Sequence, residues 1–179
     1  MSKLSYKEKY DILLSHEIAE LEYNLDATMA TLVPHPHFEI PFLGVAIKGW
    51  DAVYEMYKRM LFRGGRDRNI QAVARVIADA DNVLIREAFV SFDTLDGKRK
   101  TGLYIVVISF DPVLKKITGE RMYGDTVYAE LMQEILGADL DTIPGIVNLT
   151  DTAPIINEHD AFAAAEERGL KINNPKVKR

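Results

Sequence analysis

A change of hydrophobic period along the chain constrains its fold more than any other feature. After residue 70 the period is two, in segments rich in Val, Ile, Phe and Tyr, a pattern typical of β-strands. These segments span residues 70–78, 82–92, 102–110 and 116–128. Turn sequences such as Asp96-Gly97 and Asp111-Pro112 separate them, and connections this short predict an antiparallel meander.

The N-terminal third has helical periodicity instead. Ser5 and Glu8 have the spacing of a capping box, and the residues behind them form two apolar stripes on opposite sides of a helix. The broad stripe contains Tyr10, Leu14, Ile18, Leu21 and Leu25, and the narrow one contains Ile12, His16, Ala19 and Tyr23. Because a surface helix needs only one stripe, we expect this helix to be covered on both sides or to face a cavity. Residues 50–61 form another predicted helix, so the whole pattern predicts an α+β fold with helices on one side of a curved sheet.

The composition argues against several classes of function. A formal net charge of −5 over 179 residues does not suit a surface for nucleic acid or anionic membranes. The absence of cysteine excludes disulfides, thiolate metal sites and a cysteine nucleophile. The sequence shows neither the apolar run of a signal peptide nor a stretch long enough to span a membrane. We therefore expect a cytoplasmic protein with no membrane and no nucleic-acid partner.

Three segments carry a resemblance to a known family. They are Leu25-Asp-Ala-Thr-Met-Ala-Thr-Leu32, Phe38-Glu-Ile-Pro41 followed by Lys48-Gly-Trp-Asp-Ala-Val-Tyr54, and Ile117-Thr-Gly-Glu-Arg-Met-Tyr-Gly-Asp125. In this order and spacing the chain resembles the nuclear transport factor 2-like (NTF2-like) superfamily, in particular its SnoaL-like (polyketide-cyclase-like) and ketosteroid-isomerase-like members. The resemblance implies N-terminal helices packed into a strongly curved antiparallel sheet that forms a cone, a cystatin-like α+β barrel. We predict such a domain over residues 1–137 and an extension over residues 138–179, with a short helix near 158–168.

The ketosteroid-isomerase-like mechanism does not transfer to this chain. On the resemblance, the position of its carboxylate base falls on Ile40 and that of its acidic donor near Val106, while the position of its tyrosine falls on His16. Both carboxylates are therefore replaced by aliphatic side chains, which argues against steroid-type isomerisation by that route.

The resemblance to SnoaL-like cyclases places an acid/base carboxylate at Asp125 instead. Arg121, Tyr123 and Asp125 alternate along the predicted last strand, so they share one face, and a concave face would line the pocket. His16 is the second catalytic candidate, since imidazole titrates near neutral pH. The alternatives are a strand-end cap or a salt-bridge partner of Arg121 for Asp125, and a buried, hydrogen-bonded core residue for His16.

Aromatic side chains complete the predicted substrate-binding set with Tyr123 and Arg121. They are Trp50, Tyr54, Tyr57, Phe42 and Tyr23. Core packing is the alternative for each of them. His35, His37 and Glu39 have the residue types of a metal site, but an extended segment gives them little convergence, and we predict no metal.

These observations predict a SnoaL-like enzyme that needs no cofactor. It would isomerise, cyclise, hydrate or dehydrate a small apolar carbonyl-type substrate by acid/base chemistry, as an isomerase, cyclase, lyase or hydrolase. The alternative is a non-catalytic module that binds a hydrophobic ligand or serves dimerisation. The long strands carry apolar residues on both faces, so something must cover the second face. We expect a second copy of the chain to cover it in a homodimer, and the alternative is that residues 138–156 of the extension lie across it.

Overall fold

The computed structural model describes residues 3–64, 68–151 and 161–173. Helix α1 (Tyr6–Leu21) begins at the predicted capping box, in which Glu8 N donates to the Ser5 hydroxyl and Ser5 N donates to the Glu8 carboxylate. Helices α2 (Leu25–Ala30) and α3 (Trp50–Arg59) follow, and the chain continues from α3 into a π-helical turn (Met60–Gly64). Helix α4 (Thr126–Leu136) comes after the long strands.

A mixed sheet of seven strands forms the second layer. Its strands are β1 (His37–Ile40), β2 (Val45–Lys48), β3 (Gln71–Ala80), β4 (Val83–Asp93), β5 (Arg99–Asp111), β6 (Lys116–Gly124) and β7 (Ile146–Asn148). The spatial order is β3-β4-β5-β6-β1-β2-β7. The segment from β3 to β6 is the predicted antiparallel meander.

The sheet is mixed, because one parallel pairing accompanies the antiparallel strands expected from the sequence. Strand β1 pairs with β6 in parallel, through Glu39 and Arg121. It reaches that edge from the N-terminal helices and not through a hairpin, so no turn imposes an antiparallel direction on it. The sheet also continues past Gly137, because β7 pairs with β2.

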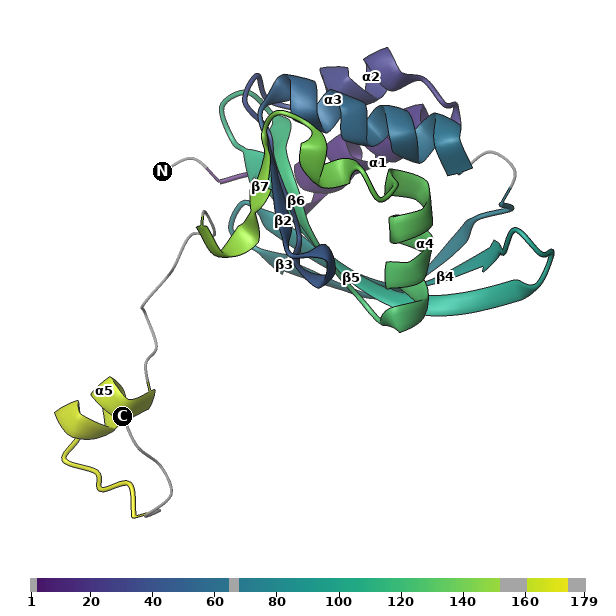
Figure 1. Ribbon diagram of the computed structural model, residues 1–179. Helices are drawn as coiled ribbons and strands as arrows, with labels where there is room; N and C mark the ends of the chain where they lie inside the picture. The colour runs from purple at the N-terminus through teal and green to yellow at the C-terminus, as the bar shows by residue number, and fades with distance from the viewer. Residues whose placement is uncertain (1–2, 65–67, 152–160, 174–179) are drawn as a thin grey trace.

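The helices lie over one face of the sheet, with α4 beside its long strands (Figure 1). The core between the layers includes Met29, Phe38, Met56, Ile108 and Ile117, each of which is fully buried. This arrangement is the predicted α+β fold, with the helical N-terminal third packed against the sheet.

Two parts of the predicted extension are described. Leu140 and Ile146 are buried against the main body of the chain. Helix α5 (Ala161–Glu167) falls within the predicted helix near 158–168, of which residues 158–160 lie outside the described ranges. No helix in the described ranges is both long and apolar enough to cross a bilayer.

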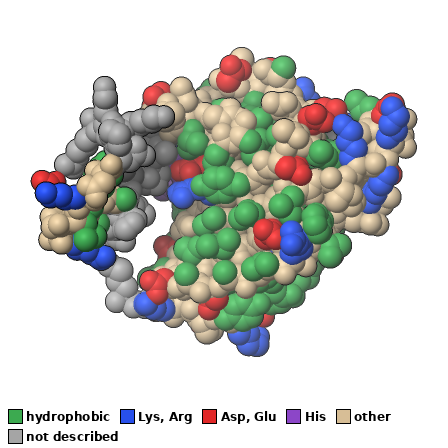
Figure 2. Space-filling model, turned by 90° about the horizontal axis from the view of Figure 1, so that it is seen from below, with side chains coloured by type: hydrophobic (Ala, Val, Ile, Leu, Met, Phe, Trp, Pro, Cys, Tyr) green, Lys and Arg blue, Asp and Glu red, His purple; other side chains and the backbone are tan. Residues whose placement is uncertain are grey.

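The face of the sheet turned away from the helices carries exposed hydrophobic side chains. Figure 2 shows them from below the sheet. Val73 on β3 is 65% exposed and Val76 54%, while Phe89 on β4 is 41% exposed. We call this surface, formed by the outward side chains of β3 to β6, the outer face.

Candidate functional site

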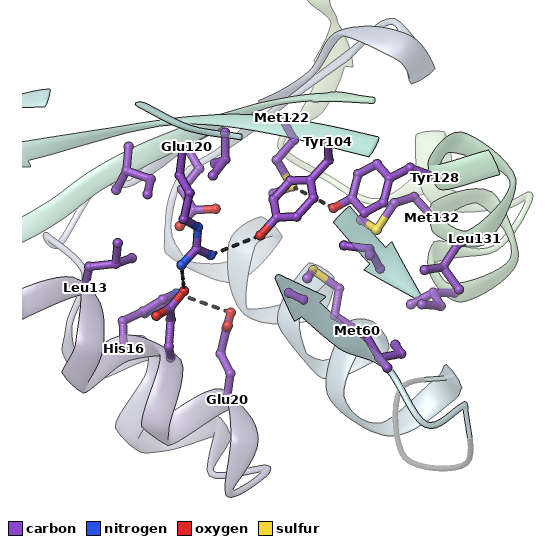
Figure 3. A pocket seen from close by; sticks show the side chains of 18 residues that line it. Leu13, His16, Glu20, Met60, Tyr104, Glu120, Met122, Tyr128, Leu131 and Met132 are labelled. Carbon is purple, nitrogen blue, oxygen red and sulfur yellow. Dashed lines mark hydrogen bonds and ion pairs between the residues drawn. The ribbon is translucent and has the colours of Figure 1, made fainter. Parts of the chain in front are cut away.

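A cavity of about 210 Å³ lies between α1, α4 and the inner face of β4, β5 and β6 (Figure 3). Most of its wall is apolar and includes Leu13, Val106, Ile108, Met122, Leu131 and Met132. The cavity adjoins a wider vestibule of about 540 Å³. The two spaces share the lining residues Glu17, Glu20, Met60, Ile70, Ala72, Arg86 and Tyr104. A small apolar chamber with a few polar groups is the usual form of a small-molecule site.

The alternation of side chains along each strand determines which polar groups enter the cavity. Arg86 on β4 lies across from Val106 on β5, which in turn lies across from Met122 on β6. Tyr104 shares the inner face of β5 with Val106, and Glu120 shares the inner face of β6 with Met122. Three polar side chains therefore project from an otherwise apolar sheet surface.

Glu120 is the polar residue that the cavity isolates. Its carboxyl lies inside the cavity (Figure 3), and it makes no hydrogen bond or ion pair within the described part of the chain. The residue as a whole is only partly buried, because it also borders a groove on the outer side of the sheet. Burial of the carboxyl raises the pKa of Glu120 to about 7; Glu20 and Glu17 add to this shift, while His16 and Arg86 oppose it.

Arg86 and Tyr104 form a paired donor group on the same wall. The guanidinium makes an ion pair with Glu17 through Nη1, and Nη2 donates a hydrogen bond of 3.0 Å to the Tyr104 hydroxyl oxygen. The Tyr104 ring stacks on Tyr128, with 5.1 Å between the ring centroids. Burial raises the pKa of Tyr104 despite the nearby Arg86, so the phenol stays protonated at neutral pH. Because its oxygen accepts from Arg86, its own proton can be donated to a ligand.

His16 lines the cavity from α1 and is also buried and hydrogen-bonded. Its Nδ1 lies 2.6 Å from the Thr31 hydroxyl, and that hydroxyl donates its proton to the Thr28 carbonyl oxygen. Nδ1 must therefore carry a proton, which leaves Nε2 to exchange protons. Nε2 lies 2.9 Å from the Tyr57 hydroxyl and 3.3 Å from a Glu20 carboxylate oxygen.

The charge state of His16 depends on its acidic neighbours. Burial alone would lower the pKa of His16, but the hydrogen bond to Glu20 and the charges of Glu20, Glu120 and Glu17 raise it above its usual value. The acidic neighbours thus favour the protonated form of the ring and offset the effect of its burial.

Asp125 lies outside the cavity. It is exposed and forms the N-cap of α4, where one carboxylate oxygen accepts from Tyr128 N and the other accepts from Leu103 N, both at 2.9 Å. The alternative from the sequence was a cap at the end of a strand, and the structure places Asp125 at the start of α4 instead.

The face of the last strand that carries Arg121 and Tyr123 does not line the cavity, and a β-bulge explains why. Phe110 pairs with Ile117 and Ser109 pairs with Gly119, so Thr118 is an extra residue in β6. If side chains alternated without interruption from the buried Ile117, Arg121 and Tyr123 would point inward. The extra residue reverses the direction in which the side chains after it point. Glu120 and Met122 face the cavity instead.

Arg121 and Tyr123 consequently lie on the outer side of the sheet. Tyr123 is 41% exposed. Arg121 Nε lies 2.6 Å from a carboxylate oxygen of Glu39, whose other oxygen lies 2.9 Å from His37 Nε2. Within the described ranges no three His, Asp or Glu side chains are grouped so as to hold a metal ion.

The predicted aromatic lining is dispersed. Tyr57 supports His16 from behind the cavity wall, and Tyr23 lines the vestibule. Trp50 and Tyr54 lie outside both spaces, because α3 turns Val53 and Met56 to the core. Phe42 packs edge-on against Tyr128, outside the cavity lining.

Sequence reasoning missed Glu120, Arg86, Tyr104 and Tyr128. The sequence does contain an indication for Arg86. It is a charged residue within the largely apolar segment from Val83 to Val90, and its side chain lies on the same face of the strand as that of Ala88. Glu17 and Glu20 follow His16 on α1, so they too could have been placed beside the cavity.

Comparisons with known proteins show the fold and not the activity. No family model and no curated protein matches the sequence. An NTF2-like protein of unknown function from Burkholderia pseudomallei K96243 superposes with a TM-score of 0.56 at 14% identity, over 72% of this chain and 98% of its own. The chain is also similar to a Bacillus subtilis protein provisionally assigned as an isomerase, with a TM-score of 0.57 at 19% identity over 72% and 95% of the two chains.

A third match points to the same fold. A Jannaschia sp. CCS1 protein provisionally assigned as a SnoaL-like polyketide cyclase superposes with a TM-score of 0.57 at 11% identity, over 75% of this chain and 97% of its own. The chain therefore has the NTF2-like fold, and one protein provisionally assigned as SnoaL-like is among its structural matches.

Proposed function

We propose that this chain is a cofactor-independent acid/base enzyme that moves a proton on a small apolar carbonyl-type substrate, with Glu120 as the acid/base group. One observation carries the proposal. The unpaired Glu120 carboxyl and the Tyr104 hydroxyl line the same small apolar cavity. A base and a hydrogen-bond donor on one cavity are what enolisation of a carbonyl compound requires.

The reaction follows from these positions. Glu120 takes a proton from the carbon next to the carbonyl, and the C–H electron pair forms the enolate double bond. The negative charge moves to the carbonyl oxygen, which accepts a hydrogen bond from Tyr104 while Arg86 supports that donor. In a β,γ-unsaturated carbonyl compound the enolate is conjugated with the second double bond, and return of the proton from Glu120 to the γ-carbon completes an isomerisation. In a substrate with a second carbonyl, the enolate carbon attacks that carbonyl carbon, and the alkoxide formed takes the proton from Glu120 to complete a cyclisation.

His16 supplies the second proton-transfer group. Its Nε2 can pass a proton between the cavity side and Glu20, while the Thr31 contact holds Nδ1 protonated. A pKa near 7 for Glu120 supports the proposal, because both of its forms are then populated near neutral pH. The provisional isomerase and cyclase assignments of two proteins with this fold are compatible with it.

Exchange of α-protons tests the proposal before the natural substrate is known. Cyclohexanone in D₂O is followed by NMR, and we expect exchange to be faster with the protein than with buffer alone. Glu120→Gln should lose about 10²- to 10⁴-fold of the added rate, the usual contribution of a general acid/base. Glu130→Gln on the exposed side of α4 is the matched control and should keep the rate.

The alternative function gives a different result. A non-catalytic module would bind the ketone without accelerating exchange, and Glu120→Gln would then leave both observations unchanged. Exchange that survives in Glu120→Gln would also contradict the assigned role of this residue.

A further inference from the structure

The charges of the ionisable groups that line the cavity do not cancel when the ion pairs among these groups are counted. Arg86 is paired with Glu17, and His16 Nε2 lies 3.3 Å from Glu20. Glu120 is left over, with no ion pair among the described residues. When it ionises, the cavity therefore holds one negative charge with no partner, which is costly in apolar surroundings.

The surroundings of this carboxyl suit an organic cation. The stacked rings of Tyr104 and Tyr128 line the cavity, and aromatic rings attract cations through their negative faces. Met60, Met122 and Met132 contribute polarisable thioether groups that adapt to the shape of an apolar body. An anionic ligand would meet Glu17, Glu20 and Glu120, and the guanidinium of Arg86 is already neutralised.

We propose that the cavity binds a protonated amine with a compact apolar body, its ammonium group lying against the Glu120 carboxylate. The inference rests on the proposed function in using the same cavity and the same carboxylate, and it narrows the substrate to an amine-bearing carbonyl compound. It does not depend on turnover, so binding alone tests it.

Binding of such a ligand must depend on pH. The charged and titratable groups that face the Glu120 carboxyl are His16, Glu17 and Glu20 from α1, Tyr57 from α3, Arg86 from β4, Tyr104 from β5 and Tyr128 from α4. On the outer side of the sheet, the groove that Glu120 also borders is lined by His35, His37, Glu39 and Arg121. An ammonium group favours the ionised carboxylate, so binding below the pKa of Glu120 releases a proton. Affinity should rise about tenfold from pH 6 to pH 8, as the ionised fraction of Glu120 grows around its pKa of about 7.

Isothermal titration with three ligands of the same shape tests the charge preference. The probes are benzylamine, benzyl alcohol and benzoate, each titrated into the full chain at pH 6 and pH 8. We expect benzylamine to bind best, and about tenfold more tightly at pH 8, with benzyl alcohol weaker and nearly independent of pH and benzoate not bound. In Glu120→Gln, benzylamine should bind no more tightly than benzyl alcohol and should lose its pH dependence, while benzyl alcohol still binds. In Glu130→Gln, the affinities of both ligands should be unchanged.

Two results would overturn the inference. One is benzyl alcohol or benzoate binding to the wild-type chain as tightly as the amine, or none of the three binding. The other is an amine advantage that persists in Glu120→Gln. Neither result depends on proton exchange. Ketone exchange without a preference for the amine would overturn this inference and leave the proposed function in place. A preference for the amine without ketone exchange would support this inference and contradict the proposed function.

Discussion

At the scale of single residues, Glu120 should destabilise the protein in a way that needs no substrate to detect. Its pKa is raised from 4.5 to about 7 on folding, so the folded chain binds more protons than the unfolded chain between these values. The stability associated with this group is therefore present below pH 4.5 and is lost as the pH rises through about 7. The pKa of His16 is also raised, so the stability associated with its protonated form is likewise lost as the pH rises.

Glu120→Gln should remove the part of this loss that belongs to the carboxylate. We expect the variant to exceed the wild type in unfolding free energy at pH 8 by on the order of 2 kcal/mol, less than the full pKa shift implies because Glu120 as a residue is only partly buried. The two proteins should converge near pH 4.5. Urea unfolding at both pH values measures the difference, and a variant less stable than the wild type at pH 8 would contradict the burial of this charge.

At the scale of secondary-structure elements, Asp125 belongs to the start of α4. Its two carboxylate oxygens accept backbone hydrogen bonds from Tyr128 and Leu103, so it joins the helix to β5. Asp125→Ala should cost about 1–2 kcal/mol of unfolding free energy, as for other N-cap losses. Asp125→Asn should cost less, because an amide oxygen can still cap the helix, and neither variant should change ketone exchange at a temperature where both are folded. Loss of ketone exchange in Asp125→Asn would instead indicate that Asp125 is the acid/base group.

Elements also show where sequence reasoning reached its limit. The capping box of α1, the helices of the N-terminal third and the meander from β3 to β6 were readable, because each depends on neighbours in sequence. The bulge at Thr118 was not readable, since it depends on how β5 and β6 pair. One extra residue therefore exchanged the predicted cavity residues Arg121 and Tyr123 for Glu120 and Met122. Strand β1 was readable as a strand, but its parallel pairing with β6 is a tertiary contact with no local signal.

At the scale of the whole molecule, the outer face remains to be explained. Every residue of β3 is exposed, and Val73, Val76 and Phe89 lie on a face that helices do not cover. Contiguous exposed apolar surface of this kind commonly marks an interaction site. The buried Leu140 and Ile146 pack with the core, so this part of the predicted extension does not cover the outer face. We therefore propose that a second copy of the chain covers it.

Charge substitutions on the outer face test this dimer. Val76→Lys places a cation on a side chain that is 54% exposed, so it should leave the fold intact while opposing burial of the face. Sedimentation equilibrium should give a dimer for the wild type and a monomer, or a dimer weakened at least about tenfold, for Val76→Lys, because burial of an ammonium group in the interface removes its hydration. Val113→Lys, at an 80% exposed residue in the β5–β6 turn, is the matched control and should remain dimeric. A monomeric wild-type chain, or a dimer unaffected by Val76→Lys, would show that the outer face is not the interface.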